Sequence, residues 1–139
     1  MRQLEVLKYP MEDMATLIGK SEADGGTVFK YHGSYTEIAE AIHRYIGVWM
    51  VEMERFFELV VFNYIYANGD AHLKNFSIIR YADDYRLTPA YDLMNTALHV
   101  RDEDFALSDG LSPLLPKSDA YLRTGHPCRQ DFEAKIGRA

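Results

Sequence analysis

The sequence predicts a mainly helical α+β domain that contains one small β-hairpin. Two stretches, 34–45 and 51–66, carry apolar residues at helical spacing. Two short runs, 76–81 and 85–88, are rich in strand-forming residues and flank a turn. With 139 residues and 47% hydrophobic composition, the chain has the size and content of one folded domain. We therefore expect a single domain over residues 1–139.

The first half of the chain should hold two helices separated by a loop. In PMEDMATLI (10–18), proline at the start and Gly19 after the end predict a short helix. The stretch SEADGGTVFKYHGS (21–34) contains three glycines and no helical period, so it predicts a loop. Ser34 or Thr36 can then cap a second helix, in which Ile38, Ala41, Ile42 and Tyr45 recur at helical spacing.

The third helix, VEMERFFELVVFNYIY (51–66), is apolar almost all round, which predicts a helix enclosed by the rest of the domain. It should end at Asn68-Gly69, two residues that tolerate left-handed backbone. The hairpin of 76–81 and 85–88 follows, with its turn at 82–84. We expect irregular chain over 99–126 and a last helix from about Pro127, which includes Phe132 and Ile136.

Charge and composition limit the classes of function. The formal net charge of -6 argues against direct binding to nucleic acid, which depends on clustered Lys and Arg. The most apolar segment, Phe56 to Ala67, is shorter than the roughly 20 residues that span a bilayer, so no membrane contact is expected. Cys128 is the only cysteine and no secretory signal is visible, which predicts a cytoplasmic protein.

The segment NGDAHLKN (68–75) places several polar side chains between the third helix and the hairpin. Alone, an Asp and an Asn five residues apart suit turn chemistry. However, the hairpin doubles the chain back, so that Asp92 in PAYD can join Asp70 and Asn75. A carboxylate and a carboxamide are suitable oxygen ligands for Mg²⁺. The sequence therefore predicts a magnesium site at Asn75 and Asp92.

Protein kinases place an Asp that accepts the substrate hydroxyl proton five positions before a metal-binding Asn, and a hairpin leads to another metal-binding Asp. The same order here makes Asp70 the predicted catalytic base. Lys74 would neutralise charge on the transferred phosphoryl group. His72 would brace the loop through hydrogen bonds, and Asn75 and Asp92 would hold the Mg²⁺ of the nucleotide.

NGDAHLKNFSII followed by YRLTPAYDLMNT resembles the HipA family of bacterial serine/threonine kinases, whose catalytic loop has the form D-x-H-x-K-N-F-S. MEDMATLIGK, FKYHGSY and FFELVVFNYIYANGDAH also resemble that family, so the resemblance covers roughly residues 8 to 137. It implies a protein-kinase-like C-terminal lobe and ATP with Mg²⁺ as cofactors. It also implies a toxin of the toxin–antitoxin type, a HipB-like helix-turn-helix antitoxin as partner, and a protein substrate such as an aminoacyl-tRNA synthetase.

The chain departs from the family in lacking an N-terminal lobe. The loop ADGGT is not followed by a strand with a suitable lysine, and Lys30 falls where the family has an ordinary connector. We therefore expect a lobe truncated at both ends that is weakly active or inactive alone. Three origins stay open: an engineered piece, a decayed reading frame, or one half of a split toxin whose N-terminal lobe is a separate protein. Two alternatives stay open: a non-catalytic module that binds an antitoxin or that other lobe, and a small-molecule phosphotransferase of the aminoglycoside-kinase type.

Overall fold

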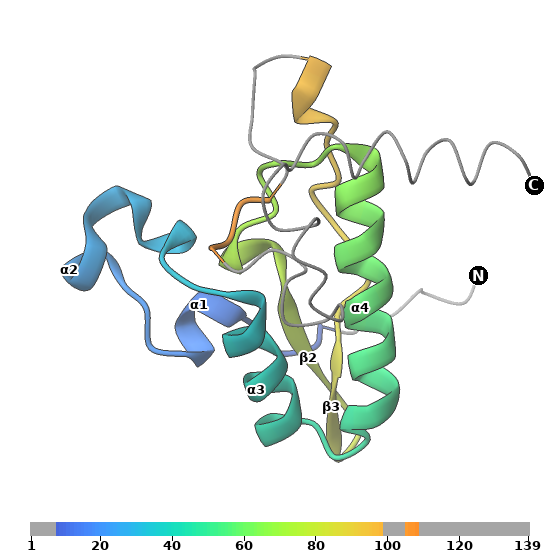
Figure 1. Cartoon of the computed structure of the whole chain (residues 1–139). Helices are drawn as coiled ribbons and strands as arrows, with labels where there is room; N and C mark the ends of the chain where they lie inside the picture. The colour runs from blue at the N-terminus through green and yellow to red at the C-terminus, as the bar shows by residue number, and fades with distance from the viewer. Residues whose placement is uncertain (1–7, 99–104, 109–139) are drawn as a thin grey trace, which may run out of the picture.

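The computed structural model describes residues 8–98 and 105–108. It has the predicted α+β character, with helices packed on a small antiparallel sheet (Figure 1). The elements in chain order are β1 (Met11–Asp13), α1 (Met14–Leu17), α2 (Glu22–Gly25), the 3₁₀ helix η1 (Gly26–Tyr31), α3 (Tyr35–Tyr45), α4 (Trp49–Tyr66), the 3₁₀ helix η2 (Leu73–Asn75), β2 (Ser77–Tyr81), β3 (Asp84–Leu87) and the 3₁₀ helix η3 (Thr96–Leu98). The predicted helix from Pro127, and most of 99–126, lie outside the described residues.

Helix α3 forms where the apolar spacing predicts it, and Ser34 caps it. The Ser34 hydroxyl accepts the Glu37 N–H at 3.0 Å, and the Glu37 carboxylate accepts the Ser34 N–H at 2.9 Å. This reciprocal capping box satisfies two backbone donors that the first helical turn would leave unpaired. Ile38 and Ile42 of α3 are fully buried, whereas Tyr45 at its end is exposed.

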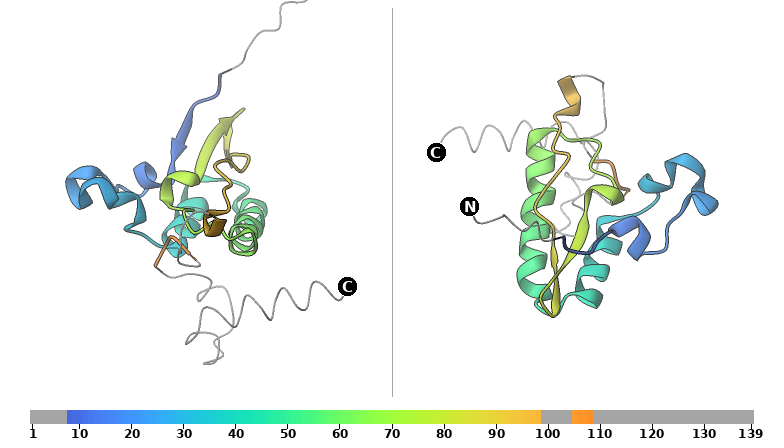
Figure 2. Two further views of the ribbon diagram at one scale, coloured as in Figure 1. Left: turned by 90° about the horizontal axis from the view of Figure 1, so that it is seen from above. Right: turned by 180° about the vertical axis from the view of Figure 1, so that it is seen from behind.

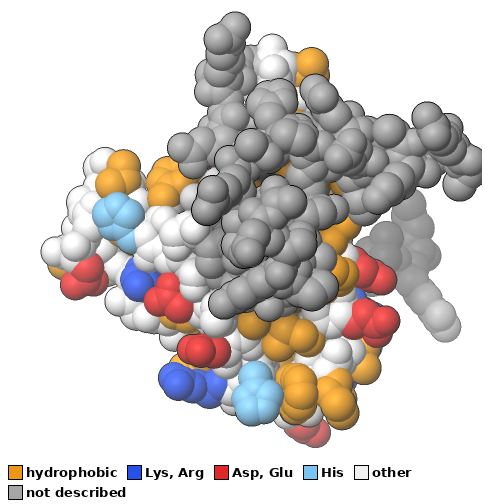
Figure 3. Space-filling model, in the orientation of Figure 1, with side chains coloured by type: hydrophobic (Ala, Val, Ile, Leu, Met, Phe, Trp, Pro, Cys, Tyr) orange, Lys and Arg blue, Asp and Glu red, His pale blue; other side chains and the backbone are white. Residues whose placement is uncertain are grey.

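Helix α4 begins two residues before the predicted stretch, and it is not enclosed as expected. Phe56 and Val60 are buried, but Phe57, Phe62, Ile65 and Tyr66 are between 38% and 45% exposed. The interpretation of an enclosed helix was wrong because an apolar composition all round does not say which faces other elements cover. Hydrophobic side chains also gather where α3 ends and α4 begins, at the lower end of the described part in Figure 3.

The sheet has three antiparallel strands in the order β1-β2-β3, one more than predicted. The helix predicted over 10–18 is wrong in its first half, because 11–13 form β1 and pair with β2, Met11 opposite Ile79. The carbonyl of Pro10 accepts the Arg80 N–H at 2.9 Å, which extends this ladder. The helix is reduced to the four residues of α1, capped by the Asp13 side chain.

The segment 21–34, predicted as a loop, contains the short helix α2 and the 3₁₀ helix η1. Ser21 precedes α2 and its hydroxyl donates to the Asp24 carboxylate at 2.7 Å. Gly26, with φ of 61°, takes the left-handed backbone that separates the two turns. The glycines thus divide two short helical turns, where the sequence pattern suggested continuous loop.

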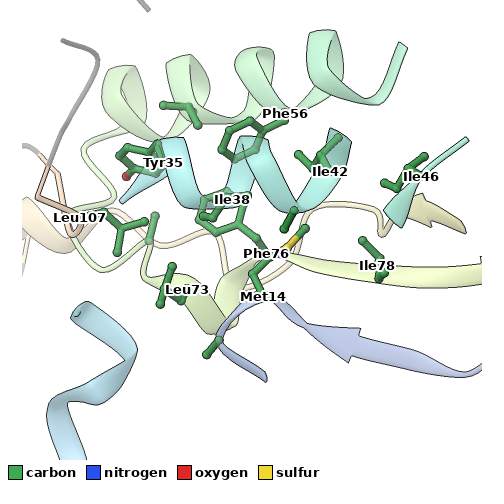
Figure 4. Packing of buried hydrophobic residues seen from close by; sticks show 14 residues of the cluster. Met14, Tyr35, Ile38, Ile42, Ile46, Phe56, Leu73, Phe76, Ile78 and Leu107 are labelled. Atoms are coloured by element: carbon green, nitrogen blue, oxygen red, sulfur yellow. The ribbon is translucent and has the colours of Figure 1, made fainter. Parts of the chain in front are cut away.

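The core lies between the sheet and the pair α3 and α4, which lie together on one side of it (Figures 1 and 2). Ile38 and Ile42 from α3, Phe56 from α4 and Phe76, which directly precedes β2, meet there (Figure 4). The Phe56 and Phe76 rings contact each other edge to face, with centroids 5.5 Å apart. Among the described helices, none is long and apolar enough to cross a bilayer.

The Asp84 carboxylate at the start of β3 ties the hairpin to the α3–α4 connection. Hydrogen bonds from the Gly47 N–H at 3.0 Å, from the Arg86 guanidinium at 2.6 Å and from the Tyr85 N–H at 2.7 Å lower its pKa to about 2, from an ordinary value of 3.8. All three donors favour the charged carboxylate, and the backbone donor of Gly47 contributes most.

We expect this carboxylate to make folding stability depend on acid pH. Because its folded pKa lies below the unfolded value, its stabilising contribution is present above about pH 4 and is lost as the pH falls to about 2. Urea denaturation of the wild-type chain and of Asp84→Asn, at steps from pH 5 to pH 2.5, measures this. The difference between the two proteins should shrink across that window. Asp83→Asn, in the exposed turn, is the control, and a pH-independent difference between wild type and Asp84→Asn would contradict the expectation.

Candidate active site

The polar segment 68–75 forms a loop between α4 and β2 that hydrogen bonds fix at both ends. Helix α4 ends at Tyr66, and its C-cap Ala67 has a left-handed φ of 60°, so the helix does not end at Asn68-Gly69 as predicted. The Asn68 amide donates to the Asn63 side chain of α4 at 2.9 Å. Thr96, further along the chain, accepts the Gly69 N–H at 2.9 Å and donates to the Ala67 carbonyl at 3.0 Å. The loop is therefore held before it reaches its functional residues.

Asn75 and Asp92 meet, as the hairpin geometry predicted. The Asn75 amide donates to Oδ2 of Asp92 at 2.6 Å, and its Oδ1 accepts the His72 N–H at 3.0 Å. Asn75 is buried whereas the Asp92 carboxylate is exposed. Asp92 has a φ of 54°, a left-handed conformation that aspartate tolerates better than most residues. The Asn68 amide reaches the Asp92 carbonyl at 3.4 Å.

Tyr91 holds the Asp92 segment against the loop. Its hydroxyl donates to the Lys74 carbonyl at 2.6 Å and lies 2.6 Å from the Ser77 hydroxyl. Since a phenol has one proton, Ser77 must donate in the second bond. Burial raises the pKa of Tyr91, and the hydrogen bond from Ser77 opposes that effect. Ser77 and Tyr91 thus join the segment NGDAHLKNFSII to the segment YRLTPAYDLMNT.

The Asp70 carboxylate is half buried and hydrogen-bonded to a residue distant in the sequence. The Tyr31 hydroxyl of η1 donates to Oδ1 of Asp70 at 2.5 Å. The Asp70 N–H has a longer contact, 3.4 Å, with the Asn68 side chain. Within the described part of the chain, the other carboxylate oxygen of Asp70 accepts no hydrogen bond. Among the described residues, one oxygen of Asp70 is thus engaged and the other is not.

His72 braces the loop through its backbone N–H, whereas its imidazole is buried beside the Tyr31 ring. Nδ1 is buried without a hydrogen-bond partner among the described residues, and the ring packs edge-on against Tyr31 with centroids 5.1 Å apart. Burial, and to a smaller degree the charge of Lys30, lower the pKa of His72. Asp70 and Asp92 both act to raise it, so both carboxylates lie within electrostatic range of this one ring.

Lys74 is exposed on the same loop, with Nζ 5.9 Å from the centre of the Phe29 ring. Lys30 lies nearby, its Nζ 5.0 Å from the centre of the Tyr31 ring. Two ammonium groups, one from the loop and one from η1, thus lie near the aromatic rings of η1. Such charges suit an anionic ligand.

Sequence reasoning missed the residues that hold the site together. Tyr31 and Lys30 come from the segment taken as a loop and as an ordinary connector, and Thr96 was quoted only as the last residue of YRLTPAYDLMNT. No spacing rule links these residues to 68–75. Tyr91 was quoted only as part of PAYD and of YRLTPAYDLMNT. Its position directly before Asp92, together with Ser77 two residues after Asn75, was a signal that could have indicated the contact between Tyr91 and Ser77.

The donor set fits Mg²⁺. Oδ1 of Asn75 accepts one hydrogen bond and has a second lone pair, and Asp92 has a carboxylate oxygen without a partner in the described residues. No group of three or more His, Cys, Asp or Glu side chains that could hold a metal occurs in the described part. Mg²⁺ typically takes one or two protein carboxylates and completes its shell with water and substrate phosphates, so a pair of this kind suffices.

Comparison with known proteins shows the family of the chain. The chain matches the family described as HipA-like C-terminal domain over residues 2–122. It is 34% identical over 102 residues to the protein named "Putative kinase Y4dM" of Sinorhizobium fredii. This match covers 69% of this chain and 22% of that protein. It is 28% identical over 93 residues to "Putative kinase Y4mE" of the same organism, 63% of this chain and 21% of that protein. The chain thus spans about a fifth of the length of these relatives. It belongs to the HipA-like C-terminal domain family.

Proposed function

We propose that this chain is the C-terminal lobe of a serine/threonine protein kinase that transfers the γ-phosphoryl group of ATP to a protein hydroxyl. The observation that carries the proposal is the contact of Asn75 with Asp92 at 2.6 Å, beside the half-buried Asp70 on the same loop. Membership of a family whose relatives are named as kinases supports it. The site would lie in a cleft completed by an N-terminal lobe.

In the proposed reaction Asp70 accepts the proton of the substrate hydroxyl. The hydroxyl oxygen forms a bond to the γ-phosphorus, the bond from that phosphorus to the bridging oxygen breaks, and ADP leaves with the bonding electrons. Lys74, exposed on the same loop, offsets charge on the phosphoryl oxygens. Asp70 needs an oxygen available for this proton, and only its Oδ1 is engaged in the described residues.

Asn75 and Asp92 are the residues that would hold Mg²⁺. When bound, the ion would neutralise charge on the β- and γ-phosphates. The Asn75 amide meanwhile keeps Asp92 at the loop, and Tyr91 keeps the following segment in place. With one lobe alone, the adenine would have a single wall to contact, so we propose weak ATP binding and little transfer for this chain by itself.

The proposal includes the toxin role, the helix-turn-helix antitoxin partner, an aminoacyl-tRNA synthetase as substrate and a cytoplasmic location. These rest on the family resemblance. An antibiotic or sugar substrate, as in the aminoglycoside-kinase alternative, also suits an Asp and an Asn five residues apart, whereas Phe76-Ser77 and the PAYD segment favour the protein kinase. Identification of the phosphorylated molecule distinguishes these substrates.

Calorimetric titration with Mg-ATP tests the metal site. Asp92→Asn retains the size of the side chain and its tolerance of left-handed backbone but removes the charge, so we expect Mg-ATP affinity to fall at least about tenfold. Titration of the wild-type chain with ATP in EDTA should show the same loss. Asp83→Asn, which removes an exposed carboxylate in the hairpin turn, should bind as wild type does. Equal affinity of wild type and Asp92→Asn would refute the metal site.

A non-catalytic interaction module is the second candidate function, and the exposed apolar side chains of α4 favour it. Phe62 and Tyr66 stack on each other at 5.4 Å while both remain more than 40% exposed. On this alternative Asp70→Asn and Asp92→Asn leave partner binding and any biological effect intact, and Phe62→Asp removes both. The catalytic proposal instead expects that Asp70→Asn and Asp92→Asn each remove the biological effect and that Phe62→Asp leaves it intact.

A further inference from the structure

The contact between Tyr31 and Asp70 joins two segments that lie 39 positions apart in the sequence. Tyr31 is the last residue of η1, the 3₁₀ helix in the segment predicted to be a loop. At 2.5 Å, the distance from its hydroxyl to Oδ1 of Asp70 is within the range of hydroxyl–carboxylate hydrogen bonds. Such bonds are about twice as strong as those between neutral groups. The contact therefore restrains Asp70 more than an ordinary turn contact would.

The Tyr31 ring has its own support, independent of the hydroxyl. It packs edge-on against the imidazole of His72, with ring centroids 5.1 Å apart, and Lys30 places its ammonium 5.0 Å from the ring centre. His72 belongs to the same loop as Asp70 and is buried. The loop residue that flanks Asp70 thus fixes the ring that carries the hydroxyl.

The hydrogen bond engages one oxygen of Asp70 and leaves the other without a partner in the described part of the chain. A half-buried aspartate held by its backbone alone can rotate about χ1 and χ2, so its second oxygen occupies several positions in turn. A donor on one oxygen fixes the carboxylate plane and therefore the position of the second oxygen. Catalysis is sensitive to displacements of this size.

We propose that Tyr31 is a positioning residue, whose hydroxyl holds the Asp70 carboxylate so that the second oxygen faces the substrate hydroxyl. This inference rests on the proposed function, because it assigns Asp70 the role of base. The substrate proton passes to the second oxygen of Asp70, while the Tyr31 proton stays on its own oxygen. The bond changes at phosphorus are those of the proposed reaction. The position of η1 is thereby coupled to the competence of the site.

The contact is tested on the purified chain by NMR, with no need for turnover. Tyr31→Phe removes the hydroxyl and keeps the ring on His72. The three-bond Hα–Hβ couplings of Asp70 should report one χ1 rotamer in the wild type and averaged rotamers in Tyr31→Phe. Tyr85→Phe, which alters an exposed tyrosine of β3, should leave the couplings unchanged. Averaged couplings in the wild type, or identical couplings in wild type and Tyr31→Phe, would overturn the inference.

Phosphoryl transfer gives the second measurement, made with the chain and its complementing lobe. Tyr31→Phe should lower kcat by about 10- to 100-fold, the range for loss of a hydrogen bond to a charged group, with KM for ATP unchanged. Unchanged or raised kcat would overturn the inference, the latter by identifying an inhibitory contact. If Asp70→Asn has no effect on transfer, or if the wild type transfers nothing, the proposed function fails. A change in kcat for Asp70→Asn but not for Tyr31→Phe refutes the inference alone.

Discussion

Replacement of Phe76 with alanine is expected to lower the free energy of unfolding by about 3–5 kcal/mol. The Phe76 side chain is 2% exposed. Its ring packs against those of Phe56 and Tyr35, with ring centroids 5.5 Å and 6.1 Å away respectively. Removal of the ring loses its burial and leaves a cavity that α3, α4 and the sheet cannot close together. The Phe76 carbonyl also accepts the Met14 N–H at 2.9 Å, so α1 should loosen as well.

Urea denaturation followed by circular dichroism measures this loss, with Phe62→Ala as the matched control. Phe62 lies on α4 and is 45% exposed, so its truncation should cost about 1 kcal/mol or less. Phe76→Leu retains most of the apolar volume and should cost about 1.5 kcal/mol or less while leaving Mg-ATP affinity unchanged. If truncation of Phe62 and of Phe76 costs the same, the described core does not depend on the ring beside the loop 68–75.

The position of Phe76 explains why the sequence predicted the candidate site better than its surroundings. Asn75, Phe76 and Ser77 are consecutive, and their side chains go to Asp92, to the core and to Tyr91 respectively. A short motif therefore carries both the chemistry and the packing that orients it. Local signals of this kind, including the Ser34 capping box and the apolar spacing of α3, depend on neighbours in the chain and can be read from sequence.

The features that the sequence did not predict depend on residues distant in the chain. Strand β1 exists because 11–13 pair with β2, and this pairing overrides the helix signal that begins at Pro10. Tyr31 reaches Asp70 across 39 positions. The left-handed residue at the end of α4 is Ala67, whose conformation is supported by the contacts of its carbonyl with Thr96. Tertiary hydrogen bonds decided each case against the local preference.

Asn75→Asp is expected to destabilise the chain by about 1–3 kcal/mol in the absence of Mg²⁺. The wild-type amide donates to Oδ2 of Asp92 at 2.6 Å. The substitution removes that donor and places two carboxylate oxygens at the same contact, where like charges repel. Part of the repulsion is relieved because Asp92 is exposed to solvent. Thermal unfolding in EDTA, compared with wild type, measures the loss.

Addition of Mg²⁺ should stabilise Asn75→Asp more than the wild type. A ligand that binds only the folded state stabilises it, and the effect is larger when the ligand binds more tightly. A pair of carboxylates attracts the ion more strongly than one carboxylate and an amide, so Mg²⁺ should raise the Tm of Asn75→Asp more than that of the wild type. The double variant Asn75→Asp with Asp92→Asn exchanges the two groups and restores a single charge. Its stability in EDTA should therefore recover toward the wild-type value, and the coupling between the two sites should be measurable as a double-mutant cycle. If the loss in Asn75→Asp is the same with and without Mg²⁺, Asn75 and Asp92 form a structural hydrogen bond and not a metal site.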